Sequence, residues 1–230
     1  MKEFLTTYCP FIIVFIVTVE FLSTFFMGYD YISKKQRISL LVTFIGVGLC
    51  LDAIVIIIGG FLPENILSIL SRIRFVSHGL LTPLNLAICG YALGWQNETK
   101  MKIVWIITGL LSAAGVAAGI LRVLETKEFG DIIRQVSSDS SPAWTDIVNN
   151  VISFGTILPL VITGVIVTIK QKSPSILLAG ILMFAFAAIG PATKNMDLSF
   201  FYSMIGEMFM LLFYLIYCRR HVRDTSNDLW

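Results

Sequence analysis

Seven apolar runs, each long enough to cross a lipid bilayer, account for most of this 230-residue chain. A helix needs about 20 consecutive apolar residues to cross a hydrocarbon core of about 30 Å. Because lipid offers the backbone no hydrogen-bond partners, such runs must form helices. The sequence therefore predicts an all-α polytopic membrane protein, with a single domain that is a seven-transmembrane-helix bundle. The expected spans cover residues 9–28, 38–62, 75–95, 102–122, 148–169, 174–192 and 198–218.

Composition supports this class and excludes others. Hydrophobic residues make up 56% of the chain and charged residues 14%, whereas soluble domains carry about 25% charged residues. The first run is longer than the apolar core of a signal peptide, so it is interpreted as a retained span. The net charge of +2 is small and its basic residues are scattered, so we expect the lipid bilayer as a partner and no nucleic acid.

The polar breaks between the runs differ in charge, which predicts the orientation. When alternate breaks are assigned to the two sides, one side holds ten of the 17 Lys and Arg residues, and each of its breaks is basic. The positive-inside rule places that side in the cytoplasm. We therefore expect a multi-pass protein of the cell membrane with its N-terminus outside, an outer loop at 123–147 and a cytoplasmic tail at 219–230.

Small residues and prolines predict how the helices pack. Small residues line the run at 102–122, including Gly109, Ser112, Gly115 and Gly119, which lets neighbouring backbones approach closely. Pro83 and Pro159 lie inside the third and fifth runs, where each removes one backbone hydrogen bond and favours a kink.

Three carboxylates fall near the middle of predicted spans: Glu20, Asp52 and Glu207. A charged group at that depth costs about 2.5 to 3.5 kcal/mol on the translocon-insertion scale, so it is expected to face the bundle interior and to have a partner there. The alternative is a protonated carboxylic acid that only hydrogen-bonds a neighbouring helix.

The third run carries a polar stripe of Arg74, His78, Thr82, Asn85 and Cys89, spaced by three or four residues and hence on one helical face. Depth counting places His78, Asn149 of the fifth run and the three carboxylates in the outer half of the membrane or near its midplane. We therefore expect a polar cavity that opens outward, with its mouth near Arg74, Arg122, Glu125 and Lys194. The predicted ligand- or proton-binding residues are Glu20, Asp52, Arg74, His78, Asn85, Asn149 and Glu207, whereas catalytic residues stay unassigned.

Several kinds of site are excluded or not expected. His78 and His221 lie at opposite membrane faces, and the four cysteines are far apart without a CxxC pair, so neither a bis-histidine haem nor a three-histidine zinc centre forms. The last span has no central lysine for a retinal Schiff base. No metal and no cofactor are expected.

Three functions remain open. Three carboxylates beside one or two cations cannot all stay charged in a low-dielectric site, so they hold a proton or a cation. This favours a proton- or cation-coupled transporter for a small ligand. The alternatives are a metal-independent membrane enzyme acting on a lipid and a seven-helix sensor that works through a partner protein. The oligomeric state is open as well.

The orientation leads to a labelling prediction. In intact cells, a cysteine introduced at Ser138 should react with an impermeant thiol reagent, whereas one at Ser173 should not, because the first lies in the predicted outer loop and the second on the basic side. The measurement is mass-tagging of the purified protein, and the reverse labelling pattern would invert the whole topology.

Overall fold

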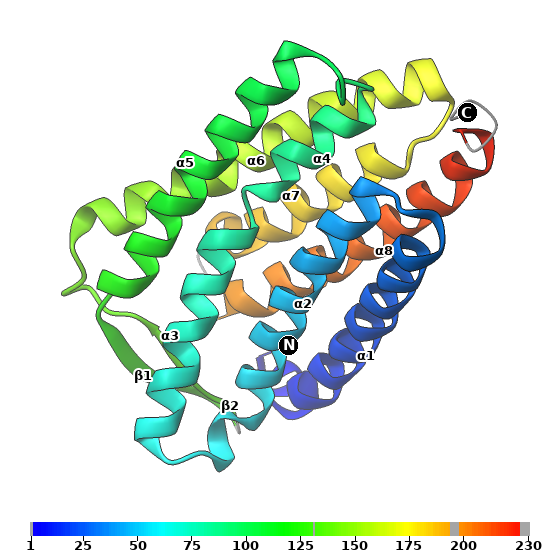
Figure 1. Cartoon of the computed structure of the whole chain (residues 1–230). Coiled ribbons are helices and arrows are strands. Elements are labelled where there is room, and N and C mark those ends of the chain that lie inside the picture. The colour runs from blue at the N-terminus through cyan, green and yellow to red at the C-terminus, as the bar shows by residue number, and fades with distance from the viewer. Residues whose placement is uncertain (1, 131, 194–197, 226–230) are drawn as a thin grey trace.

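The computed structural model describes the backbone of residues 2–130, 132–193 and 198–225, and the side chains of 8–130, 132–193 and 198–220. Figure 1 shows a bundle of long helices with one small hairpin at an end. In chain order the elements are α1 (Lys2–Lys34), α2 (Arg37–Ile58), the 3-10 helix η1 (Gly59–Phe61), α3 (Glu64–Leu81), α4 (Leu84–Ala92), α5 (Thr99–Leu121), β1 (Leu124–Phe129), β2 (Ile132–Ser137), α6 (Ala143–Gln171), α7 (Ser175–Thr193) and α8 (Ser199–Thr225).

Six helices of the described chain are long and apolar enough to cross a membrane: α1, α2, α5, α6, α7 and α8. Their outward faces carry large exposed hydrophobic side chains such as Phe15, Ile106 and Ile162. In water this surface would be unfavourable, whereas in a bilayer it contacts lipid tails. The chain is therefore a helical, multi-pass membrane protein, as the sequence predicts.

The third predicted span differs from expectation because Pro83 divides it. Helix α3 begins at Glu64, well before residue 75, and α4 follows after Thr82 and Pro83. Both intervening residues keep right-handed helical backbone angles, but the hydrogen bonds tighten to Asn85 N–Thr82 O (3.2 Å) and Leu86 N–Pro83 O (3.0 Å). Proline lacks the N–H that would continue the regular pattern. By contrast, α6 continues through Pro159 without a break.

Part of the predicted outer loop forms an antiparallel β-hairpin. Strands β1 and β2 pair with Glu128 opposite Ile133 and Lys127 opposite Arg134. The hairpin lies across the end of the bundle at η1, α2 and α3 (Figure 1). It approaches closely there, because a Cβ added to Gly59 would overlap the backbone oxygen of Ile133.

The turns that the sequence analysis assigns to the basic side lie at one end of the bundle. The turns α1–α2, α4–α5 and α6–α7 and the end of α8 gather at the end of the bundle opposite the hairpin (Figure 1). There Asp30 of α1 pairs with Lys34 (3.0 Å) and with Arg219 of α8 (3.2 Å). Ser173 in the α6–α7 turn is buried, whereas the adjacent Lys172 is exposed, so Lys172 is the better labelling position on this side.

Glycines allow a close contact between the backbones of α3 and α5. A Cβ on Gly115 would overlap the backbone of Gly79, and a Cβ on Gly79 would come 2.5 Å from the backbone oxygen of Gly115. One turn further on, a Cβ on Gly119 would come 2.9 Å from the backbone of Val76. The small residues of α5 thus bring its backbone against α3, which is the packing role expected for them.

This contact predicts a position-dependent effect of alanine. Gly115→Ala should lower the free energy of unfolding by about 1 to 3 kcal/mol, because the obstructing atoms are backbone and cannot move aside. Gly109→Ala on the same helix is the control, since a Cβ there meets no atom within 4 Å, and it should be neutral or stabilising. Thermal unfolding of the purified protein in detergent measures both. Equal effects of the two changes would contradict this account of the α3–α5 contact.

Candidate functional site

A small internal cavity lies between the helices, in the middle of the chain's polar residues. Its volume is about 50 Å³, and α2, α3, α4, α6, α7 and α8 contribute to its walls. The volume is sufficient for a water molecule. The lining residues are Ile45, Leu49, His78, Thr82, Asn85, Ser153, Thr156, Ile157, Leu160, Met183, Glu207 and Met210.

The polar stripe of the third span turns toward this cavity. His78, Thr82 and Asn85 all line it, although Pro83 separates α3 from α4. Thr82 and Pro83 keep helical backbone angles. Residues spaced by three and four therefore stay on one face across the break between α3 and α4. The structure therefore brings His78, Asn85 and Glu207 together, as the sequence predicts.

The three carboxylates come from helices that contact one another, α1, α2 and α8. Glu20 is 1% exposed and Glu207 is 7% exposed. The charge of Glu207 interacts with those of Asp52, Glu20 and Arg74, and that of Glu20 interacts with Asp52. One carboxylate oxygen of Glu20, Oε2, is buried without a hydrogen-bond partner. The three groups thus share one electrostatic environment.

Arg74 supplies the cation of this environment. Its Nε lies 3.1 Å from Asp52 Oδ1, and its Nη2 donates a 2.9 Å hydrogen bond to the backbone oxygen of Gln135 in β2. The third nitrogen, Nη1, is buried without a partner. Arg74 therefore joins α3 to α2 and to the hairpin at once.

The predicted mouth of the cavity is covered in this structure. Arg74 and Arg122 are 5% and 7% exposed, and both guanidinium groups lie over the ring of Phe75. Arg122 also pairs with Asp146 at 3.4 Å. Glu125 lies on the hairpin, and Lys194 is outside the described residues. The outward opening stays a prediction, because the hairpin covers the place where it was expected.

His78 and Asn85 have different surroundings. Asn85 is held on both sides, since its Nδ2 donates to Thr82 O (3.0 Å) and its Oδ1 accepts from Tyr214 Oη (2.6 Å). His78 is half-buried against the cavity, and its charge would interact with Asp52, Arg74 and Arg122. Asn85 is therefore fixed by two hydrogen bonds, whereas His78 contributes to the cavity wall.

Asn149 does not join this group. Its side chain is exposed on α6 and does not line the cavity, whereas Ser153 and Thr156 of the same helix do. Of the predicted binding residues, Asn149 is therefore the one that the structure places away from the cavity and exposed. Sequence reasoning also missed Gln135, whose contribution is a backbone oxygen. The β-branched residues around Gly130 could have signalled a hairpin, because such runs on either side of a short turn favour one.

Comparison with known proteins assigns no family to this chain. No family model matches the sequence, and no curated protein matches it significantly. Among the described residues, no group of three or more His, Cys, Asp and Glu side chains is arranged to hold a metal ion. The site must therefore be interpreted from its own chemistry.

The ion pair of Arg74 gives a matched mutational test. Asp52→Asn should destabilise the protein by about 3 kcal/mol or more, because it leaves a buried guanidinium without its counter-charge. Asp146→Asn also removes the partner of a buried arginine, but the Asp146 side chain is 65% exposed, so its loss should cost under about 1 kcal/mol. Unfolding in detergent measures the difference. Equal losses would show that the Asp52–Arg74 pair is no more than a surface contact.

Proposed function

We propose that this membrane protein binds a proton or a small cation among Glu20, Asp52 and Glu207 and couples that binding to the transport of a small ligand. The observation that carries the proposal is that the contacting helices α1, α2 and α8 hold three carboxylates, of which Glu20 and Glu207 are buried and Asp52 pairs with Arg74. Arg74 balances Asp52, so two carboxylates are left without a matched cation among the described residues. In a poorly solvated interior such groups hold a proton or a cation.

The size of the cavity favours this function over lipid chemistry. About 50 Å³ accommodates a water molecule or a hydrated proton, whereas binding sites for larger ligands measure about 300 to 1,000 Å³. The polar lining of Thr82, Ser153 and Thr156 offers oxygen atoms of the kind that bind water or a hard cation. A lipid substrate would need a larger cavity beside Glu207, the carboxylate that lines this one.

The topology proposed for this function has seven crossings. Helices α3 and α4 together extend from the hairpin end to the opposite end of the bundle (Figure 1), so we take them as the third crossing. The end that holds the hairpin would face outward and the basic end would face the cytoplasm, which places the protein in the cell membrane with its N-terminus outside. The hairpin then covers the outer side of the site, and the break at Pro83 beside His78 and Asn85 supplies a hinge.

The carboxylates should behave as a coupled group. In Glu207→Gln, the protonation of Glu20 should shift, because removing one of two like charges in a poorly screened site changes the proton affinity of the other. In Glu20→Gln the same should hold for Glu207, and the double variant should be non-additive. The measurement is the infrared carbonyl band of protonated carboxyl groups during a pH titration. Asp30→Asn is the matched control, because Asp30 is buried but paired with Lys34 and Arg219 at the other end.

A transport assay tests coupling itself. In vesicles that contain the purified protein and a pH-sensitive dye, an imposed Na⁺ or K⁺ gradient should move protons, and Glu207→Gln should abolish this movement. Additive effects in the infrared titration, together with an absence of proton movement under any gradient, would make the carboxylates structural hydrogen-bonders and remove the main support for a transporter.

A further inference from the structure

A second and much larger pocket lies at the hairpin end of the bundle, where η1, the start of α1 and the hairpin meet. Its volume is about 650 Å³, which is within the range of sites for organic ligands. It shares no lining residue with the internal cavity. The two are therefore separate features that can be tested independently.

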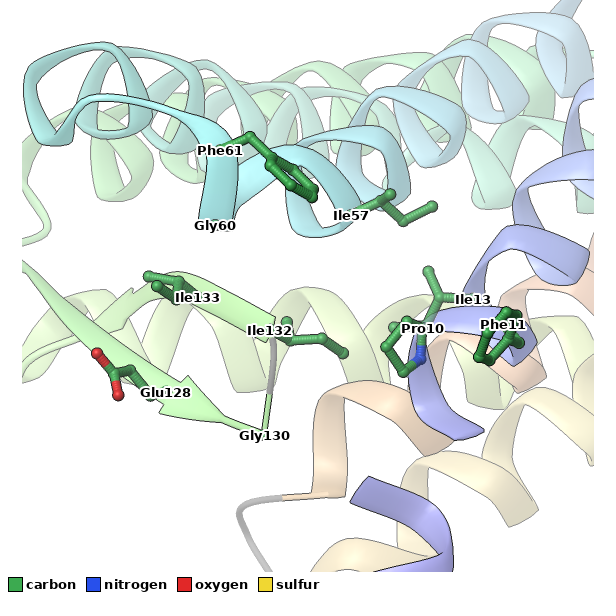
Figure 2. Close-up of a pocket in the computed structure, with 10 residues that line it drawn as sticks. All are labelled: Pro10, Phe11, Ile13, Ile57, Gly60, Phe61, Glu128, Gly130, Ile132 and Ile133. Carbon is green, nitrogen blue, oxygen red and sulfur yellow. The ribbon is translucent and has the colours of Figure 1, made fainter. Parts of the chain in front are cut away.

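The walls of the pocket are mostly apolar and come from three parts of the chain. Figure 2 shows Ile57 and Phe61 on one side, Ile132 and Ile133 of β2 on the other, and Pro10 and Ile13 of α1 at one end. Phe11 and Phe61 at its margins are 73% and 86% exposed. In a helical membrane protein, such exposed apolar side chains face lipid, so the pocket is accessible to an alkyl chain from the bilayer.

Among the residues whose side chains are described, Glu128 is the one charged residue that lines this pocket. Figure 2 places it at the end away from α1. Glu128 stands opposite Ile133 in the hairpin register, and opposite residues share a face. Lys127 points to the other face and pairs with Glu125 at 3.2 Å. Within the described residues Glu128 has no ion pair, so the pocket combines apolar walls with one uncompensated negative charge.

We propose that this pocket binds a single-chain amphiphile with a positively charged head group, such as a long-chain amine. The alkyl chain lies between η1 and the hairpin, and the ammonium group lies at Glu128. A fatty acid would place its carboxylate against Glu128 and be repelled, which gives the site selectivity by charge.

Photo-crosslinking tests this proposal with the full chain in phosphatidylcholine nanodiscs. The probe is hexadecylamine carrying a photoreactive diazirine in mid-chain, and the comparison probe is the fatty acid of the same length. We expect the amine to form adducts in the segments around Pro10, Phe61 and Ile132, and excess unlabelled hexadecylamine to suppress them. Labelling by the amine should exceed that by the acid about fivefold, as expected for one exposed ion pair.

Three variants of the hairpin distinguish recognition of the charge at Glu128 from apolar binding of the alkyl chain. Glu128→Gln should lower labelling by the amine to the level of the acid, and because Glu128 is exposed the change should leave folding intact. Glu125→Gln is the matched control, since it removes a carboxylate from the opposite face of β1 and should change nothing. Ile133→Trp should reduce labelling by both probes because the indole fills the pocket.

Four results would overturn the proposal. Labelling that unlabelled amine does not suppress, or adducts spread along lipid-facing surfaces, would show ordinary contact with bilayer lipid. Equal labelling by amine and acid, or an equal effect of the Glu125 and Glu128 changes, would show that Glu128 does not select the ligand. None of these readouts depends on Glu20, Asp52 or Glu207, so the outcome is distinct from that of the transport assay.

Discussion

The ion pair between Arg74 and Asp52 is the interaction on which the arrangement of the site depends. A guanidinium that is 5% exposed must find acceptors inside the protein. Asp52 provides one from α2, and the backbone of Gln135 provides another from the hairpin. These bonds join two helices and the hairpin at one point. They also decide the charge balance, because the pairing of Arg74 with Asp52 leaves Glu20 and Glu207 without an equivalent partner.

Long apolar runs made most of the membrane-spanning helices predictable. The third predicted span is the exception, because its first part is not apolar enough. Helix α3 carries Arg72, Arg74 and His78, so its apolar face is narrow and its first half does not resemble a lipid-exposed span. Its start at Glu64 was therefore missed. The hairpin was missed because polar residues dominate the segment at 123–147, and of its two strands only Phe129, Ile132 and Gln135 are buried.

The residues of the candidate site were also predictable only in part. The spacing of His78, Thr82 and Asn85 identified a common face, since helical periodicity depends only on sequence separation. Helical periodicity shows on which face a residue lies, but not whether a neighbouring helix covers that face along its whole length. Asn149 therefore matched the pattern of Ser153 and Thr156 but lies exposed, near the start of α6. The acceptor on Gln135 was beyond prediction for another reason, because every residue has a backbone oxygen and only the fold decides which one meets Arg74.

The interruption at Pro83 and the close approach of α3 to α5 belong to one local structure. Proline has no N–H, so Pro83 cannot donate to the carbonyl of Gly79, four residues earlier. That carbonyl faces Gly115, where a side chain would collide with it. Glycine at position 115 therefore leaves room beside the carbonyl whose usual N–H donor the proline lacks. The proline of one helix and the glycine of another therefore form a matched pair, and in related chains we expect the two positions to covary.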